Sequence, residues 1–205
     1  MTRFLWLAAT TVLAFGADVP RVTYTKSFPG SDPAYLAVTV DKGGAATYRE
    51  AKDEEPETFK LEGDAVRAIF DLADKLDHFK RPLESGLKVA KTGDKTFRWE
   101  NGAETSEAKF NYSLDESAKQ LQDWFERVSE SERAMMNLRR AIRFDKLGVN
   151  DAVLRVDTAW SQKRLVGREQ FVPLLDRIAK NEAFVNLARD RAARLADDLR
   201  KASGE

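Results

Sequence analysis

The chain has 205 residues, no cysteine and a single histidine, His78. Without cysteine it can form no disulfide, thiolate nucleophile or lipid-modified cysteine, so its stability depends on packing. With one histidine, a zinc site would consist mainly of carboxylates, which suit zinc poorly, and a Ser–His pair would have to use His78. His78 follows Asp71 and Asp74 at spacings that match no established ligand motif. We therefore expect no metal, no cofactor and no catalytic residue from these residue types.

The sequence also lacks the common motifs of catalysis and nucleotide binding. It contains no Gly-x-Ser-x-Gly elbow, phosphate loop or dinucleotide fingerprint. The acidic run at residues 53–55 lacks the alternating ligands and the glycine of a calcium loop. The formal net charge is zero, which does not favour nucleic acid as a partner. Because 34 acidic residues allow many carboxylate pairs, a carboxylate-dependent hydrolase remains an alternative to a non-catalytic protein.

Long apolar runs are absent except at the N-terminus, where residues 1–16 have the features of a secretory signal peptide. Arg3 precedes a charge-free apolar run over residues 4–15, and Ala14 and Gly16 place small residues at the expected cleavage site. A run of about 12 residues is too short to span a bilayer, which requires roughly 20. We expect an exported protein, periplasmic or extracellular, with no transmembrane segment after cleavage. An uncleaved N-terminal anchor is the alternative.

Residues 17–130 predict an α+β domain. Residues 35–41 alternate between apolar and polar side chains, and Gly43 and Gly44 supply a hairpin turn before the next short strand. Helical periodicity follows over residues 64–76 and again over 116–128, where Leu121, Trp124 and Phe125 share one face. Residues 35–79 and 87–128 resemble two β-hairpin/helix units, the second with a strand beginning at Leu87. The pattern predicts an antiparallel sheet with helices on one face.

Residues 131–205 show only helical periodicity and predict an all-α bundle. The charge changes sign at the same boundary. Residues 17–130 hold 17 Lys and Arg against 23 Asp and Glu, whereas residues 131–205 hold 16 against 11. Either the two halves attract each other and pack, or the basic helical end meets an anionic surface.

Aromatic side chains are the remaining candidates for a binding site. Phe28, Tyr35, Tyr48 and Trp99 lie on or beside predicted strands, where they would line a sheet face that grips a sugar or a peptide. Phe28 is on a proline-containing loop that would suit contact with a partner. The competing interpretation is that these aromatics fill the core under the helices.

Four segments of the chain carry a resemblance to known sequences: residues 26–35, 79–90, 110–112 and 144–149. In these segments the chain resembles an uncharacterised family of exported proteins of acidobacteria, and the resemblance extends over nearly the whole chain after the leader. The family has no known activity, so the resemblance transfers no catalytic residue. It implies that the two halves belong to one unit.

These observations favour a non-catalytic binding or protein-interaction module of the cell envelope. Its partner would be an unknown protein or envelope component. Two alternatives remain: a carboxylate-dependent hydrolase, and an envelope scaffold that contacts anionic lipid through the basic helical end.

Overall fold

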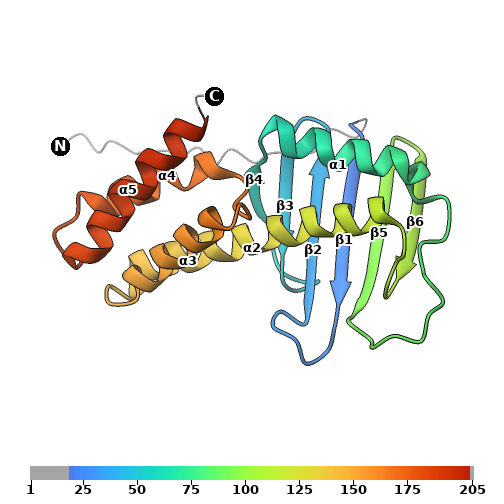
Figure 1. Ribbon diagram of the computed structural model, residues 1–205, viewed down its shortest axis with the longest axis horizontal. Helices are drawn as coiled ribbons and strands as arrows, with labels where there is room; N and C mark the ends of the chain where they lie inside the picture. Colours follow the sequence, from blue (N-terminus) through green and yellow to red (C-terminus); the bar gives the residue numbers. More distant parts are fainter. Residues whose placement is uncertain (1–18, 204–205) are drawn as a thin grey trace, which may run out of the picture.

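The computed structural model describes residues 19–203, so the predicted leader, residues 1–16, lies outside the described residues. Six strands and five α-helices form two packed halves, with a sheet on one side and helices alone on the other (Figure 1). The strands are β1 (Arg21–Ser27), β2 (Tyr35–Asp41), β3 (Ala45–Arg49), β4 (Glu57–Lys60), β5 (Asp94–Asn101) and β6 (Glu104–Phe110). The helices are α1 (Gly63–Lys75), α2 (Glu116–Phe144), α3 (Val149–Ser161), α4 (Val172–Ala179) and α5 (Asn186–Ser203), with short 3-10 turns at Asp77–Phe79 and Arg168–Gln170.

The strands form one antiparallel sheet in the order β4-β3-β2-β1-β5-β6. Both α1 and α2 lie across the same face of this sheet (Figure 1). The predicted antiparallel sheet with helices on one face is therefore confirmed, and so is the helical region that follows it. The alternation of side chains explains this arrangement, because each strand places its apolar residues on the face that the helices cover.

The core of the sheet half contains the aromatic side chains of that face. Phe97 lies 5.5 Å from Tyr24 and 5.0 Å from Phe110, measured between ring centroids. Phe125 of α2 stacks on Tyr24 at 5.4 Å and is fully buried. Aromatic pairs at such distances stabilise a core beyond their buried area alone.

The opposite face of the sheet is rich in threonine. Thr58, Thr47, Thr39 and Thr23 lie in register across the four strands β4, β3, β2 and β1. The hydroxyls of Thr23 and Thr39 are 3.0 Å apart and hydrogen-bonded. Cross-strand threonine pairs of this kind stabilise a sheet face that no helix covers.

The strand expected to begin at Leu87 is absent, because residues 80–93 are irregular. Leu87 is 53% exposed, so its side chain finds no face to bury. Side chains take the place of strand pairing: Asn111 accepts from the backbone N–H of Thr92 at 2.8 Å, and its amide donates to the carbonyl of Ala90 at 3.1 Å. The second predicted unit therefore contains fewer strand residues than expected. Both edges of the sheet still consist of a hairpin followed by a helix: β3 and β4 before α1, and β5 and β6 before α2.

The expected boundary between residues 130 and 131 falls inside α2, which runs without interruption from the sheet half into the helical half (Figure 1). The hydrophobic core does change there. Val128 belongs to the core under the sheet, whereas Ala134 and Met135 belong to the core among α2, α3, α4 and α5. The boundary therefore separates two cores, and one 29-residue helix connects them.

Ion pairs join the two halves. Their arginines lie within residues 131–205 and their carboxylates within residues 17–130, in agreement with attraction between the halves. The pairs are Arg133–Asp32 and Arg133–Glu50 at 2.9 Å, Arg139–Glu57 at 3.0 Å, Arg164–Asp123 at 3.0 Å, Arg164–Glu130 at 2.6 Å and Arg168–Glu62 at 3.3 Å. None of the helices within residues 19–203 combines the length and the apolar character that crossing a bilayer requires.

Candidate functional site

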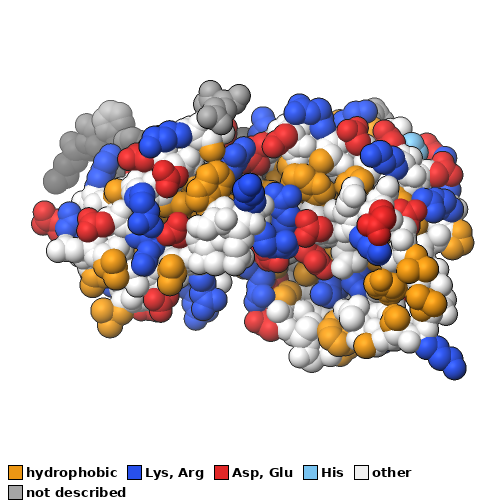
Figure 2. All heavy atoms as spheres, viewed as in Figure 1, with side chains coloured by type: hydrophobic (Ala, Val, Ile, Leu, Met, Phe, Trp, Pro, Cys, Tyr) orange, Lys and Arg blue, Asp and Glu red, His pale blue; other side chains and the backbone are white. Residues whose placement is uncertain are grey.

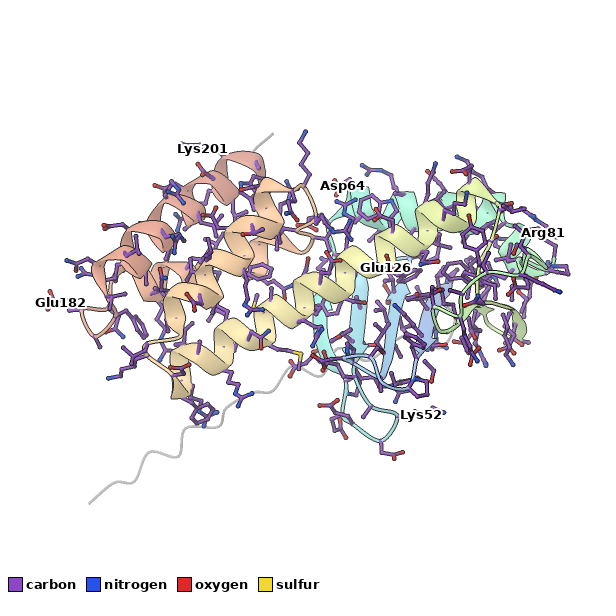
Figure 3. The ribbon with its side chains drawn as sticks, turned by 60° about the horizontal axis from the view of Figure 1, so that its bottom comes forward. Lys52, Asp64, Arg81, Glu126, Glu182 and Lys201 are labelled. Atoms are coloured by element: carbon purple, nitrogen blue, oxygen red, sulfur yellow. The ribbon has the colours of Figure 1, made fainter. Side chains whose placement is uncertain are left out.

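A pocket of about 480 Å³ lies where the two halves meet. We call it the junction pocket. The start of α1, the middle of α2, the end of α3 and the segment 163–168 surround it. Figure 3 labels Asp64 at the start of α1, beside the part of α2 that carries Glu126. The volume of the junction pocket is within the range of small-molecule sites.

Two tryptophans are the largest apolar side chains that line the junction pocket, beside Ala65, Leu165 and Val166. Trp124 of α2 packs against the core of the sheet half, and Trp160 of α3 packs against the core of the helical half. Each also has an arginine over its ring: Arg127 at 4.1 Å from the centroid of Trp124, and Arg168 at 6.0 Å from that of Trp160. The pocket therefore combines indole surface with guanidinium groups, and each core contributes one indole.

Arg127 is the cation of the pocket with the least compensation. It forms no ion pair with any residue in the described part of the chain, and its buried Nε has no hydrogen-bond partner there. Burial lowers the pKa of Arg127, and the charge of Asp123 opposes this shift. A buried donor without a partner costs free energy, and because Arg127 is only half-buried, the remainder of its guanidinium is the part that an acceptor on a ligand would contact.

Lys163 also lines the junction pocket, and it too forms no ion pair within residues 19–203. It is exposed, and its φ of 57° places it in the left-handed region in the turn after α3. Helices commonly end with a residue in this conformation just after the C-cap, which is Gln162 here. Asp64 is the corresponding exposed carboxylate on the α1 side of the pocket. Figure 2 shows Lys and Arg side chains gathered over the middle of the molecule, where α2 passes between the halves.

Glu62 holds the segment 166–168 against the sheet half. Its carboxylate accepts from the backbone N–H of Gly167 at 2.8 Å and from that of Arg168 at 2.5 Å, and it pairs with the Arg168 side chain at 3.3 Å. Gly167 has a φ of 64°, which glycine adopts at little cost. From the other side, the hydroxyl of Ser131 accepts from the N–H of Val166 at 3.0 Å. These bonds fix the wall of the junction pocket.

Glu132 lies beneath the same segment and is only 2% exposed. Its carboxyl accepts from the amide of Gln170 at 2.6 Å. Burial raises the pKa of Glu132 to about 7, while the hydrogen bond from Gln170 and the charge of Arg139 oppose the shift. Glu132 does not line the junction pocket. Its carboxyl therefore supports the segment above it and does not face a ligand in the pocket.

The four aromatic residues predicted as a binding face do not share an accessible surface. Tyr48 and Trp99 are 0% and 4% exposed and belong to the core under the helices. The Tyr48 hydroxyl donates to Glu50 at 2.8 Å, and Trp99 stacks on His78 at 4.1 Å. For Tyr48 and Trp99 the competing interpretation is therefore correct: their side chains fill the core.

Phe28 and Tyr35 are half-buried at the two ends of the loop between β1 and β2. The N–H of Phe28 donates to the carbonyl of Ala34 at 2.8 Å, and the ammonium of Lys52 lies 5.7 Å from the Tyr35 ring. Neither residue lines the junction pocket. The loop is thus closed by its own hydrogen bonds.

His78 lies in a left-handed turn. Asp77, His78 and Phe79 have φ values of 50°, 50° and 66°, and the ring of His78 is 2.7 Å from the carboxylate of Asp74. The hydroxyl of Ser106 donates to the carbonyl of His78, so that the ring takes no part in this bond. No group of three or more potential ligands that could hold a metal ion occurs within residues 19–203. The His78 ring instead pairs with Asp74 and covers Trp99.

The sequence analysis missed the residues of the junction pocket. It placed Trp124 on a helix face with Leu121 and Phe125, which is correct, but a helix face alone does not separate core from pocket wall. The spacing of Trp124 and Arg127 by three residues is the only local signal, because such residues are neighbours on a helix. No protein-family model and no curated protein matches this chain.

Proposed function

We propose that this chain is an exported, non-catalytic interaction module that binds a peptide segment of an envelope protein in the junction pocket. One observation carries the proposal: Trp124, Trp160 and Arg127 line the same pocket, and Arg127 forms no ion pair within residues 19–203. An apolar side chain of the partner would lie against the indoles, while a carboxylate or carbonyl oxygen would accept from Arg127 or Lys163. The predicted signal peptide over residues 1–16 is the expectation that favours an exported setting.

The position of the junction pocket supports binding by both halves. One tryptophan belongs to each core, so a bound segment would contact the sheet half and the helical half together. The pocket wall is fixed before a ligand enters, because Glu62 and Ser131 already hold residues 166–168. A prepared site loses less conformational entropy when it binds.

The carboxylates of the pocket support binding rather than hydrolysis. Glu62 is occupied by two backbone N–H groups and Arg168, which leaves Asp64 as the exposed carboxylate. The carboxyl with a pKa of about 7, Glu132, is buried away from the pocket. A hydrolase with a carboxylate pair would require both groups to face one substrate.

Affinity capture from envelope extract tests the proposal. The tagged chain is compared with Arg127→Met, which keeps an aliphatic side chain over Trp124 and removes the donors, and with Trp160→Ala. Leu87→Ser is the matched control, because Leu87 is exposed far from the pocket. We expect one protein to be retained by the parent chain and the control, and lost from both pocket variants. Capture that is equal for all four chains, or no capture at all, would contradict the proposal.

A further inference from the structure

The turn between α2 and α3 exposes two large apolar side chains. Phe144 is 74% exposed and Leu147 is 84% exposed, the highest values among the large apolar residues of the described chain. We call these two residues the apolar tip. The turn lies at the end of the molecule opposite the sheet, and Figure 2 shows hydrophobic side chains there (Figures 1 and 2). Exposed apolar side chains clustered at one end mark an interaction surface.

Cations surround the apolar tip. Arg140, Arg143 and Lys146 form no ion pair with any carboxylate within residues 19–203. The guanidinium of Arg143 lies 5.1 Å from the centroid of the Phe144 ring. The acidic residue of the turn is already engaged, because the carboxylate of Asp145 accepts from the N–H of Gly148 at 3.0 Å and so helps to start α3. The three cations outnumber this one carboxylate, so the turn keeps a net positive charge.

Helix geometry brings the charges and the apolar side chains together. Arg140 and Phe144 are four residues apart and Arg143 lies beside them, so the last turn of α2 presents all three on neighbouring positions. A second turn, between α4 and α5, lies at the same end of the molecule and exposes Val185 and Leu187 at 47% and 59% (Figures 1 and 3). The end of the helical half is thus a protruding surface with exposed apolar side chains; the unpaired cations lie beside the α2–α3 turn, and the exposed Glu182 lies in the α4–α5 turn (Figure 3).

We infer that this end docks on an anionic phospholipid surface. Phe144 and Leu147 would enter the headgroup region, while Arg140, Arg143 and Lys146 contact the phosphates. A protruding tip with unpaired cations matches the shape and charge of a negatively charged bilayer, whereas a partner protein would need a complementary groove with acidic walls. The inference is independent of the proposed peptide binding, because the junction pocket lies between the halves and contains none of these residues.

Sedimentation with lipid vesicles tests the inference. The full chain is mixed at low salt with vesicles of equal parts phosphatidylglycerol and phosphatidylcholine, or with vesicles of phosphatidylcholine alone. We expect binding to the anionic vesicles only, with loss at 1 M salt, where the Debye length falls to about 3 Å. Each basic side chain near such a surface contributes roughly fivefold in affinity, so Arg140→Gln, Arg143→Gln and Lys146→Gln together should weaken binding on the order of 100-fold.

The apolar contribution is measured with Phe144→Ser and Leu147→Ser together, for which we expect a loss of about tenfold or more. Leu87→Ser with Val89→Ser is the matched control, since it removes two exposed apolar side chains at the other end and should leave binding unchanged. Circular dichroism confirms that each variant is folded. Equal binding by tip variants and parent chain, or binding lost in the control instead, would overturn the inference. Dimers that dissociate in the tip variants would identify a second copy as the occupant instead.

Discussion

Glu132 provides the sharpest test of how the segment that closes the junction pocket is held on α2. Its carboxyl is buried under the segment that closes the junction pocket, accepts from Gln170 at 2.6 Å, and has a pKa of about 7 because burial disfavours the charged form. In the unfolded chain a glutamate has a pKa of about 4.3. Between these two values the folded state binds a proton that the unfolded state has released. The contribution of Glu132 to stability therefore falls as pH rises through this window and is constant outside it.

The expected magnitude follows from the pKa difference. A rise of roughly 2.7 pKa units at about 1.4 kcal/mol each corresponds to about 4 kcal/mol of unfolding free energy in all, of which about 3 kcal/mol is lost between pH 4.5 and pH 7.5. Glu132→Gln keeps the oxygen that accepts from Gln170 and removes the titration. The free energy of unfolding of the parent chain, relative to that of the Gln variant, should fall by about 3 kcal/mol over this range.

Urea unfolding of both chains at four pH values, followed by circular dichroism, measures this difference. Glu55→Gln, at an exposed loop position, measures the effect of net charge alone. A difference between parent and Glu132→Gln that stays constant within about 0.5 kcal/mol would refute the reasoning. So would a parent chain that gains stability relative to the Gln variant as pH rises, because Arg139 would then stabilise the charged form more than burial penalises it.

Three further predictions concern packing and the pocket wall, and urea unfolding measures each of them. Phe125→Ala should cost about 3–5 kcal/mol, because Phe125 is fully buried against Tyr24; a cost under about 1 kcal/mol would contradict this packing. Ser131→Ala should cost about 1–3 kcal/mol, since it leaves the buried N–H of Val166 without its acceptor, and an unchanged midpoint would contradict the bond. Gly167→Ala should cost about 1–2 kcal/mol through its φ of 64°, and a more stable variant would show that the segment has another conformation.

The sheet half was predictable because its signals are local. The alternation of apolar and polar residues predicted β2 and β3, and the glycines between them predicted the hairpin turn. An alternating pattern is typical of a strand with one buried face and does not fit a helix. Leu87 and Val89 show the same alternation without forming a strand, because glycines with positive φ flank them at Gly86 and Gly93 and Asn111 occupies the neighbouring backbone groups. Alternation alone does not show whether a partner strand is present.

The junction pocket was not predictable because its contacts span the chain. Glu62 meets Gly167, and Trp124 lines the same cavity as Trp160, although no local pattern links these positions. The predicted aromatic face failed for a related reason. Tyr48 and Trp99 lie on the face of the sheet that the helices cover. The sequence pattern alone does not show which face of a strand the helices cover.

Photo-crosslinking tests the binding role of the junction pocket most directly. A photoreactive amino acid replaces exposed Lys163 at the pocket or, as the matched control, exposed Lys88 at the far end of the sheet half. Both chains are irradiated in envelope extract, with and without Arg127→Met. We predict one crosslinked protein from position 163, absent from position 88 and lost with Arg127→Met. The same crosslink from both positions, or one that persists with Arg127→Met, would contradict the junction pocket as the binding site.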